Sequence, residues 1–156
     1  MDFVHRWGRY WIVGIMIAFL VTGCGEGGRR KGRRRAHAHP TSGPHDGILL
    51  EWGDEEYHVE LTIDNAKKEA TVYILDDTAK KAEPIEAETI TLIVTSEKPP
   101  VEIQLKPDPQ EDDPKGKASR FTGSHAVLGN EDLKGAISGK VAGKAYKDEF
   151  DFEKKK

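Results

Sequence analysis

Histidine and carboxylate side chains that could bind a metal ion gather around residue 45. His37, His39 and His45 lie in one short stretch, and Asp46 follows the last of them directly. In an extended chain, side chains two residues apart point the same way, so the first two imidazoles would lie together. Neutral imidazole is a good ligand for copper and zinc ions. This stretch therefore predicts a loose copper or zinc site, and the alternative is an incidental polar linker.

Two further candidate ligands follow on a predicted strand. With a period of two, His58 and Glu60 fall on the polar face, opposite the apolar residues that alternate with them. We expect both side chains to face solvent and to complete the site with residues 45 or 46; the alternative is an exposed strand histidine without a role. The full set of predicted ligands is His37, His39, His45, Asp46, His58 and Glu60.

Patterns typical of catalysis are weak or missing. Cys24 is the only cysteine, and no G-x-S-x-G nucleophile motif is present. Residues 139–144, GKVAGK, are one residue short of a phosphate-binding loop, and a hairpin explains them better. The acidic residues between positions 108 and 113 lack EF-hand spacing, which favours a solvated loop over a calcium site. We therefore predict that the chain is not an enzyme.

The first 23 residues have the pattern of an export signal. Arg6 and Arg9 precede the uncharged run 11–21 (WIVGIMIAFLV), and small residues follow it. The run is about half the ~20 residues that a membrane-spanning helix needs. A basic start, a short apolar run and small residues before a cleavage point are typical of a secretory signal peptide.

Residues 21–24, VTGC, resemble the lipobox of bacterial lipoproteins. In that family a lipid is attached to the cysteine thiol and the chain is cleaved before it, which the resemblance implies for Cys24. Gly25 stands where an aspartate is associated with inner-membrane retention, so we expect the periplasmic side of the outer membrane. The alternative is an uncleaved anchor, for which the positive charges after the run would keep the domain inside the cell.

Residues 24–45 predict a flexible basic tether, because Gly, Arg, Pro and Ser occur there without apolar periodicity. A polybasic stretch beside a lipid anchor gains about 1 kcal/mol per charge at an anionic surface. We therefore expect lipid head groups rather than nucleic acid as partners, and the alternative is a solubilising spacer. The residues expected at anionic lipid are Arg29, Arg30, Lys31, Arg33, Arg34 and Arg35.

The remaining body, residues 46–153, is acidic and has the pattern of short strands. From residue 46 onward 25 Asp and Glu oppose 16 Lys and Arg. Alternating apolar residues predict strands over 57–64, 89–95 and 101–106, and a final pair around a turn at 142–143. Residues 70–75 are apolar on both faces, which predicts a central strand, and a short strand holding Phe121 is expected over 119–122. Alanine at the first position of that turn would be strained. We predict an all-β domain, an antiparallel two-sheet sandwich of the immunoglobulin-like kind, followed by a frayed tail at 154–156.

The body is similar to a group of small exported bacterial proteins of unassigned function. The likeness lies in residues 45–53 (HDGILLEWG), 55–61 (EEYHVEL), 71–76 (TVYILD) and parts of 79–85 and 113–121, and it covers most of residues 45–152. Similar segments precede some heavy-metal efflux adaptor proteins of the periplasm. The resemblance implies a periplasmic β domain and a link to metal handling.

Together these patterns predict a membrane-anchored envelope lipoprotein with a binding or interaction module. Its partners would be the membrane, through Cys24, and a transition-metal ion or an envelope efflux complex. The alternative is a purely structural envelope lipoprotein, in which the domain is a spacer without a ligand.

Overall fold

The computed structural model describes residues 42–153, and this part of the chain is built from strands. The elements are β1 (Ile48–Trp52), β2 (Tyr57–Asp64), β3 (Glu69–Leu75), β4 (Ile90–Val94), β5 (Val101–Pro107), β6 (Arg120–Ser124), η1 (Ala126–Gly129), β7 (Asp132–Val141) and β8 (Lys144–Glu153). Every strand predicted from the apolar patterns is found, within one or two residues, and β1 is a further strand that was not predicted. Within the described range the only helical element is the single 3-10 turn η1, which confirms the all-β prediction.

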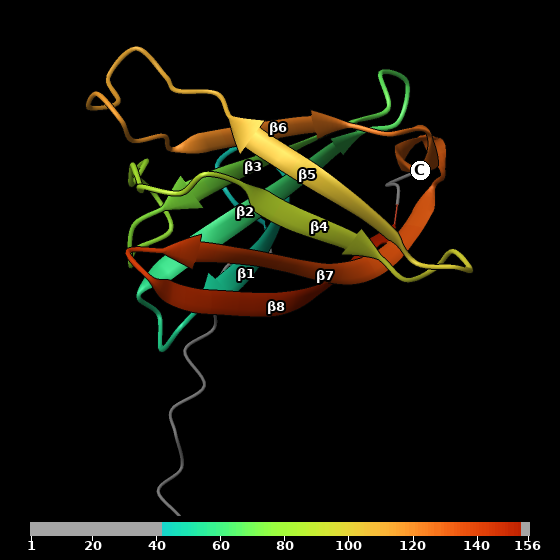
Figure 1. Ribbon diagram of the computed structural model, residues 1–156. Coiled ribbons are helices and arrows are strands. Elements are labelled where there is room, and N and C mark those ends of the chain that lie inside the picture. The colour runs from blue at the N-terminus through green and yellow to red at the C-terminus, as the bar shows by residue number, and fades with distance from the viewer. Residues whose placement is uncertain (1–41, 154–156) are drawn as a thin grey trace, which may run out of the picture. The chain divides into compact units, whose positions relative to one another are not determined.

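The strands form one antiparallel sheet in the order β1-β2-β3-β6-β5-β4-β7-β8. Its two halves are joined by a short pairing of β5 with β6, at Lys106↔Thr122 and Pro107↔Phe121. The edge strands β1 and β8 approach each other, so the sheet is nearly barrel-like (Figure 1). The antiparallel arrangement is therefore confirmed. The two-sheet immunoglobulin-like sandwich is not, because the β5–β6 pairing makes the sheet continuous.

Side chains join β1 to β8 at one end of the seam between them. The Glu51 amide donates a hydrogen bond to Asp148 Oδ2 at 3.1 Å. The Trp52 ring stacks on Tyr146 with centroids 5.5 Å apart, and the Tyr146 hydroxyl donates to Glu56 Oε2 at 2.8 Å. These contacts close this end of the seam although β1 and β8 are not neighbours in the sheet.

The interior of the barrel is filled by side chains. Trp52 packs directly over Gly139, where a Cβ would lie 2.6 Å from the indole ring. Inward-facing residues of both halves complete the core, as the alternating patterns predicted. The largest fully buried apolar side chains are Trp52, Phe121, Leu61, Ile74, Leu75, Ile90, Leu92, Leu105, Leu128, Leu133 and Ile137. A small barrel packed in this way leaves its ends and outer faces as the surfaces for binding.

The hairpin between β7 and β8 has the predicted tight turn. Ala142 and Gly143 have φ angles of 47° and 86°, so both lie in the left-handed region that a type I′ turn requires. The phosphate-loop-like sequence at 139–144 is therefore a hairpin, as expected. Alanine pays a steric penalty in this conformation because its Cβ approaches the following carbonyl.

Candidate functional site

A short segment before β1 folds over the outer face of β2 and β3, and we call it the N-terminal strap (Ser42–Gly47). Ser42 pairs with Ile48 in an isolated antiparallel bridge. Asp46 has a φ of 59°, which turns the chain back toward β1. The first four residues of the strap were predicted to belong to the flexible tether, whereas in the structure they pack against the domain.

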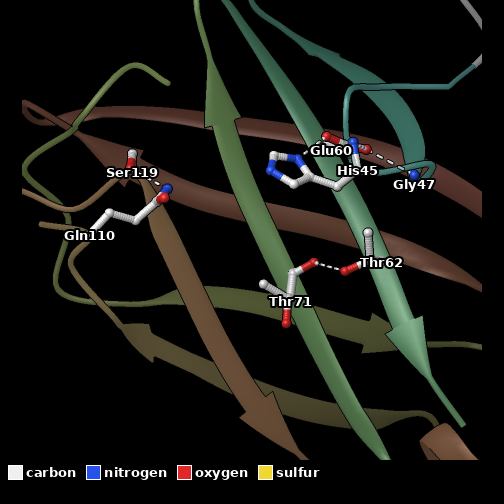
Figure 2. Close-up of polar contacts among 7 residues, drawn as sticks. All are labelled: His45, Gly47, Glu60, Thr62, Thr71, Gln110 and Ser119. Atoms are coloured by element: carbon white, nitrogen blue, oxygen red, sulfur yellow. Dashed lines mark hydrogen bonds and ion pairs between the residues drawn. The ribbon is translucent and has the colours of Figure 1, made fainter. Parts of the chain in front are cut away.

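The strap is held by the carboxylate of Glu60 on β2 (Figure 2). Glu60 Oε1 accepts hydrogen bonds from the backbone amides of His45 at 2.7 Å and Gly47 at 2.8 Å. Glu60 Oε2 lies 2.7 Å from Nδ1 of the His45 ring. Glu60 has no solvent exposure. A buried carboxylate needs such charge-assisted hydrogen bonds to offset its lost hydration, and all three donors come from the strap.

Two glycines allow the strap to lie directly on Glu60. A Cβ added at Gly43 would lie 2.4 Å from the Glu60 carboxyl carbon. One added at Gly47 would lie 2.6 Å from the Leu61 carbonyl oxygen. Any side chain at these positions would push the strap away from β2 and lengthen the hydrogen bonds to the carboxylate.

The His45 ring is fixed from two sides. It stacks on Tyr73 of β3 with centroids 3.7 Å apart and planes 6° from parallel, and the β2–β3 register places Tyr73 beside Glu60. Because a carboxylate oxygen accepts, Nδ1 is the donor to Glu60, and in the neutral ring Nε2 then carries the lone pair. The His45 side chain is 41% exposed. This is the arrangement by which proteins orient imidazoles that bind metals.

The predicted solvent exposure of His58 and Glu60 is wrong. The two side chains share the outer face of β2, as expected, but His58 is only 2% exposed and Glu60 is fully buried. The His58 ring nitrogen Nδ1 bonds to the Asp76 carbonyl oxygen at 3.0 Å. The strap covers Glu60, and the segment after β3 contacts His58. A period of two on one strand cannot reveal segments that cover it from elsewhere in the chain.

The segment that contacts His58 is organised by the Asp76 side chain. Its Oδ1 accepts from the Thr78 hydroxyl at 2.7 Å and from the Lys80 amide at 3.1 Å. Burial raises the pKa of Asp76, but these hydrogen bonds outweigh it and hold the pKa below its usual value. This aspartate therefore has a structural task in the loop.

Only two of the predicted metal ligands meet in the described part of the chain, namely His45 and Glu60. Asp46 lies on the exposed turn of the strap, and His58 bonds to the loop after β3. Within residues 42–153, no three His, Cys, Asp or Glu side chains come together as a metal site. His37 and His39 lie outside the described residues, as do Cys24 and the six basic residues at 29–35, so their roles stay predictions.

An open groove of about 760 Å³ lies beside the strap at the end of the barrel. Ile48, Ile63 and Phe152 supply its apolar floor from the ends of β1, β2 and β8. Three carboxylates also line it: Asp46, Asp64 and Glu153. This groove was not predicted, because its lining residues come from β1, β2 and β8, and β8 is far from the other two in the sequence.

One carboxylate of the acidic loop after β5, that of Asp113, holds the loop together through hydrogen bonds. Asp113 Oδ2 accepts from the amides of Gln110 and Ser119, both at 2.8 Å, and from the Ser119 hydroxyl at 3.1 Å. The Gln110 amide group also donates to the Ser119 hydroxyl at 2.9 Å (Figure 2). Burial raises the pKa of Asp113, but these hydrogen bonds and the nearby Arg120 hold it below its usual value.

Comparisons of the chain with protein-family models, with curated proteins and with solved structures found no match. Among the described residues, no helix has the length and apolar character needed to span a membrane.

Proposed function

We propose that this chain is a lipid-anchored protein of the bacterial cell envelope whose barrel-like domain is a binding or interaction module. Residues 1–23 would direct export, Cys24 would carry the lipid, and the basic residues at 29–35 would contact anionic head groups. The expected place is the periplasmic face of the outer membrane, where the domain would dock to an envelope or efflux complex.

The observation that carries this proposal is the attachment of the strap to Glu60. A flexible tether alone would leave the domain free to rotate about its joint. Here three donors from the strap meet one fully buried carboxylate, which fixes where the N-terminal strap joins the barrel. Fixing this joint is useful to a module that must present a defined surface to a partner, because pre-organisation lowers the entropic cost of docking.

The test is the mass and location of the chain in the bacterium that makes it. We expect the parent protein in the membrane fraction with its N-terminus at Cys24 and a thioether-linked lipid on that residue. Cys24→Ala should stay unprocessed, whereas the neighbouring Gly25→Ser should be processed normally. An unmodified parent chain that still begins at Met1 would refute the proposal.

A second candidate function, capture of a copper or zinc ion, is favoured by the His45 geometry. The bond from His45 Nδ1 to Glu60 fixes the ring and leaves Nε2 as a ligand atom, with Glu60 as its orienting partner. Further imidazoles would come from His37 and His39, as the sequence predicts. Ordering of the tether costs about 1–2 kcal/mol per residue, so micromolar affinity is expected.

Calorimetric titration with Cu²⁺ and Zn²⁺ tests the second candidate. His45→Ala should weaken binding at least as much as His39→Ala. His125→Ala, on the loop before η1, is the matched control and should leave the affinity unchanged. Equal affinity of the parent and the His45 variant would exclude the strap from any metal site.

A further inference from the structure

The groove beside the strap combines an apolar floor with acidic walls. Ile48, Ile63 and Phe152 are partly buried side chains that pack against the core and still line the groove. Among the described lining residues there is no lysine or arginine, whereas Asp46 and Glu153 are exposed carboxylates. An acidic boundary around apolar residues fits a ligand that is both apolar and cationic.

From this groove we infer a docking site for an extended polypeptide segment in which apolar and cationic residues alternate. The inference rests on the proposed function in one respect, the assignment of the domain as a binding module. It goes further by naming the surface and the chemistry of the partner.

The strand ends that line the groove, and its mixture of apolar and acidic side chains, favour an extended segment. Its walls are the start of β1, the end of β2, the end of β8 and the strap. In an extended segment, successive side chains point to opposite sides, so apolar residues can face the floor while cationic residues reach the carboxylates. Burial of apolar side chains on the floor supplies affinity, and the carboxylates supply selectivity.

The charges of the domain support the same partner. From residue 46 onward there are 25 acidic and 16 basic residues, which gives a negative field that attracts cationic segments. The Asp64 carboxylate already pairs with Lys67 at 3.0 Å. Selectivity for a cationic partner is therefore expected mainly from Asp46 and Glu153.

The experiment measures binding of labelled hexapeptides to the purified full-length chain by fluorescence anisotropy. The probe is Lys-Val-Lys-Val-Lys-Val, and its two comparison peptides are Glu-Val-Glu-Val-Glu-Val and Lys-Ser-Lys-Ser-Lys-Ser. We expect micromolar binding of the probe, and weaker binding of both comparison peptides by about tenfold or more. The double variant Asp46→Asn with Glu153→Gln should weaken binding of the probe by about fivefold.

Three controls make the result decisive. Glu102→Gln removes an exposed carboxylate on β5, outside the groove, and should change nothing. Phe152→Ala should weaken the probe while circular dichroism shows that the fold is kept. A variant with Lys154, Lys155 and Lys156 replaced by Ala should bind the probe at least as tightly as the parent, and loss of binding would assign the affinity to the tail and overturn the inference.

Equal binding of all three peptides, or no effect of the groove variants, would overturn the inference. Binding of the acidic peptide as tight as that of the probe would assign the groove to any apolar ligand and would also overturn it. Self-association of the protein that depends on Phe152 would assign the groove to a second copy of the chain. None of these readings depends on the lipid, so they are separate from the test of Cys24.

Discussion

Glu60 shows how a single residue acquires a role that its position in a strand does not suggest. On the outer face of β2 a glutamate is normally a solubilising side chain. Here the strap lies over it, and the carboxylate receives two backbone amides and one imidazole nitrogen. Removing a buried acceptor of this kind leaves its donors without a partner. The loss of folding free energy is then larger than the net contribution of the hydrogen bonds themselves, because the donors stay desolvated.

Replacement of Glu60 tests this account. Glu60→Leu should lower the free energy of unfolding by about 2–4 kcal/mol, because the strap loses its acceptor and detaches from β2. Hydrogen exchange should then accelerate at the amides of His45 and Gly47. Thr62→Val, two residues further on the same face, should stay within about 0.5 kcal/mol of the parent. Unchanged exchange at both strap amides in the Leu variant would contradict the role of Glu60.

Asp113 makes a prediction about pH. Its folded pKa is lowered, so its ionised form stabilises the fold above the unfolded value of about 3.9, and this contribution is lost as pH falls through the folded value. Asp113→Asn should therefore destabilise the protein at pH 7, by about 1–2 kcal/mol. The gap between parent and variant should narrow below about pH 4 in urea unfolding.

The exposed neighbour Asp112 provides the control for Asp113. Asp112→Asn removes the same charge without removing any of the hydrogen bonds that organise this loop. It should change the free energy of unfolding little at pH 7. A gap between the parent and Asp113→Asn that stays constant down to pH 2 would show that the charge of Asp113 is not what the loop uses.

At the scale of the elements, the strands follow directly from alternation in the sequence. β2 begins and ends at the predicted residues because its apolar side chains recur every second position and face one core. The turn between β7 and β8 was also predicted, including its strained alanine, because only two residues separate the strands.

The β7–β8 turn gives a prediction in the stabilising direction. Ala142→Gly should raise the free energy of unfolding by about 0.5–1 kcal/mol, because glycine adopts a φ of 47° without the steric penalty of a Cβ. Ala145→Gly, three residues later inside β8, should instead destabilise the hairpin, since glycine is unfavourable within a strand. Thermal unfolding of the two variants checks this, and destabilisation by both would show that the turn is not strained.

At the scale of the whole molecule, the two halves of the sheet share one core and should unfold together. The chain has three tryptophans, at positions 7, 11 and 52, so a chain cleaved before Cys24 retains only the buried Trp52. Trp52 lies at the β1–β8 seam and packs on Gly139 of β7. Its fluorescence therefore reports on the contact between the first and last strands.

The prediction for the cleaved chain is a single cooperative transition in urea. The emission of Trp52 should shift to longer wavelength at the same midpoint as the loss of the far-ultraviolet β signal. An earlier change in fluorescence would mean that the seam opens before the sheet unfolds. In that case the contacts of Glu51, Trp52 and Tyr146 between β1 and β8 would break before the rest of the sheet unfolds.

The sequence by itself determined the strands from β2 onward, the core face of those that alternate, the tight turn and the all-β class. These are local properties, because the period of a strand and the left-handed turn depend on residues close to one another in the chain. The candidate ligands were also visible as residue types, and the pairing of His45 with Glu60 was anticipated as part of a larger cluster.

Only the tertiary structure decided how the strands assemble and what covers them. The single continuous sheet depends on the pairing of β5 with β6, and the burial of Glu60 depends on a strap from fifteen residues earlier in the chain. Such contacts are set by the balance of packing and hydrogen bonding across the whole domain. No pattern within one strand contains that information, so the polar face of β2 that was expected to be exposed is buried at His58 and Glu60.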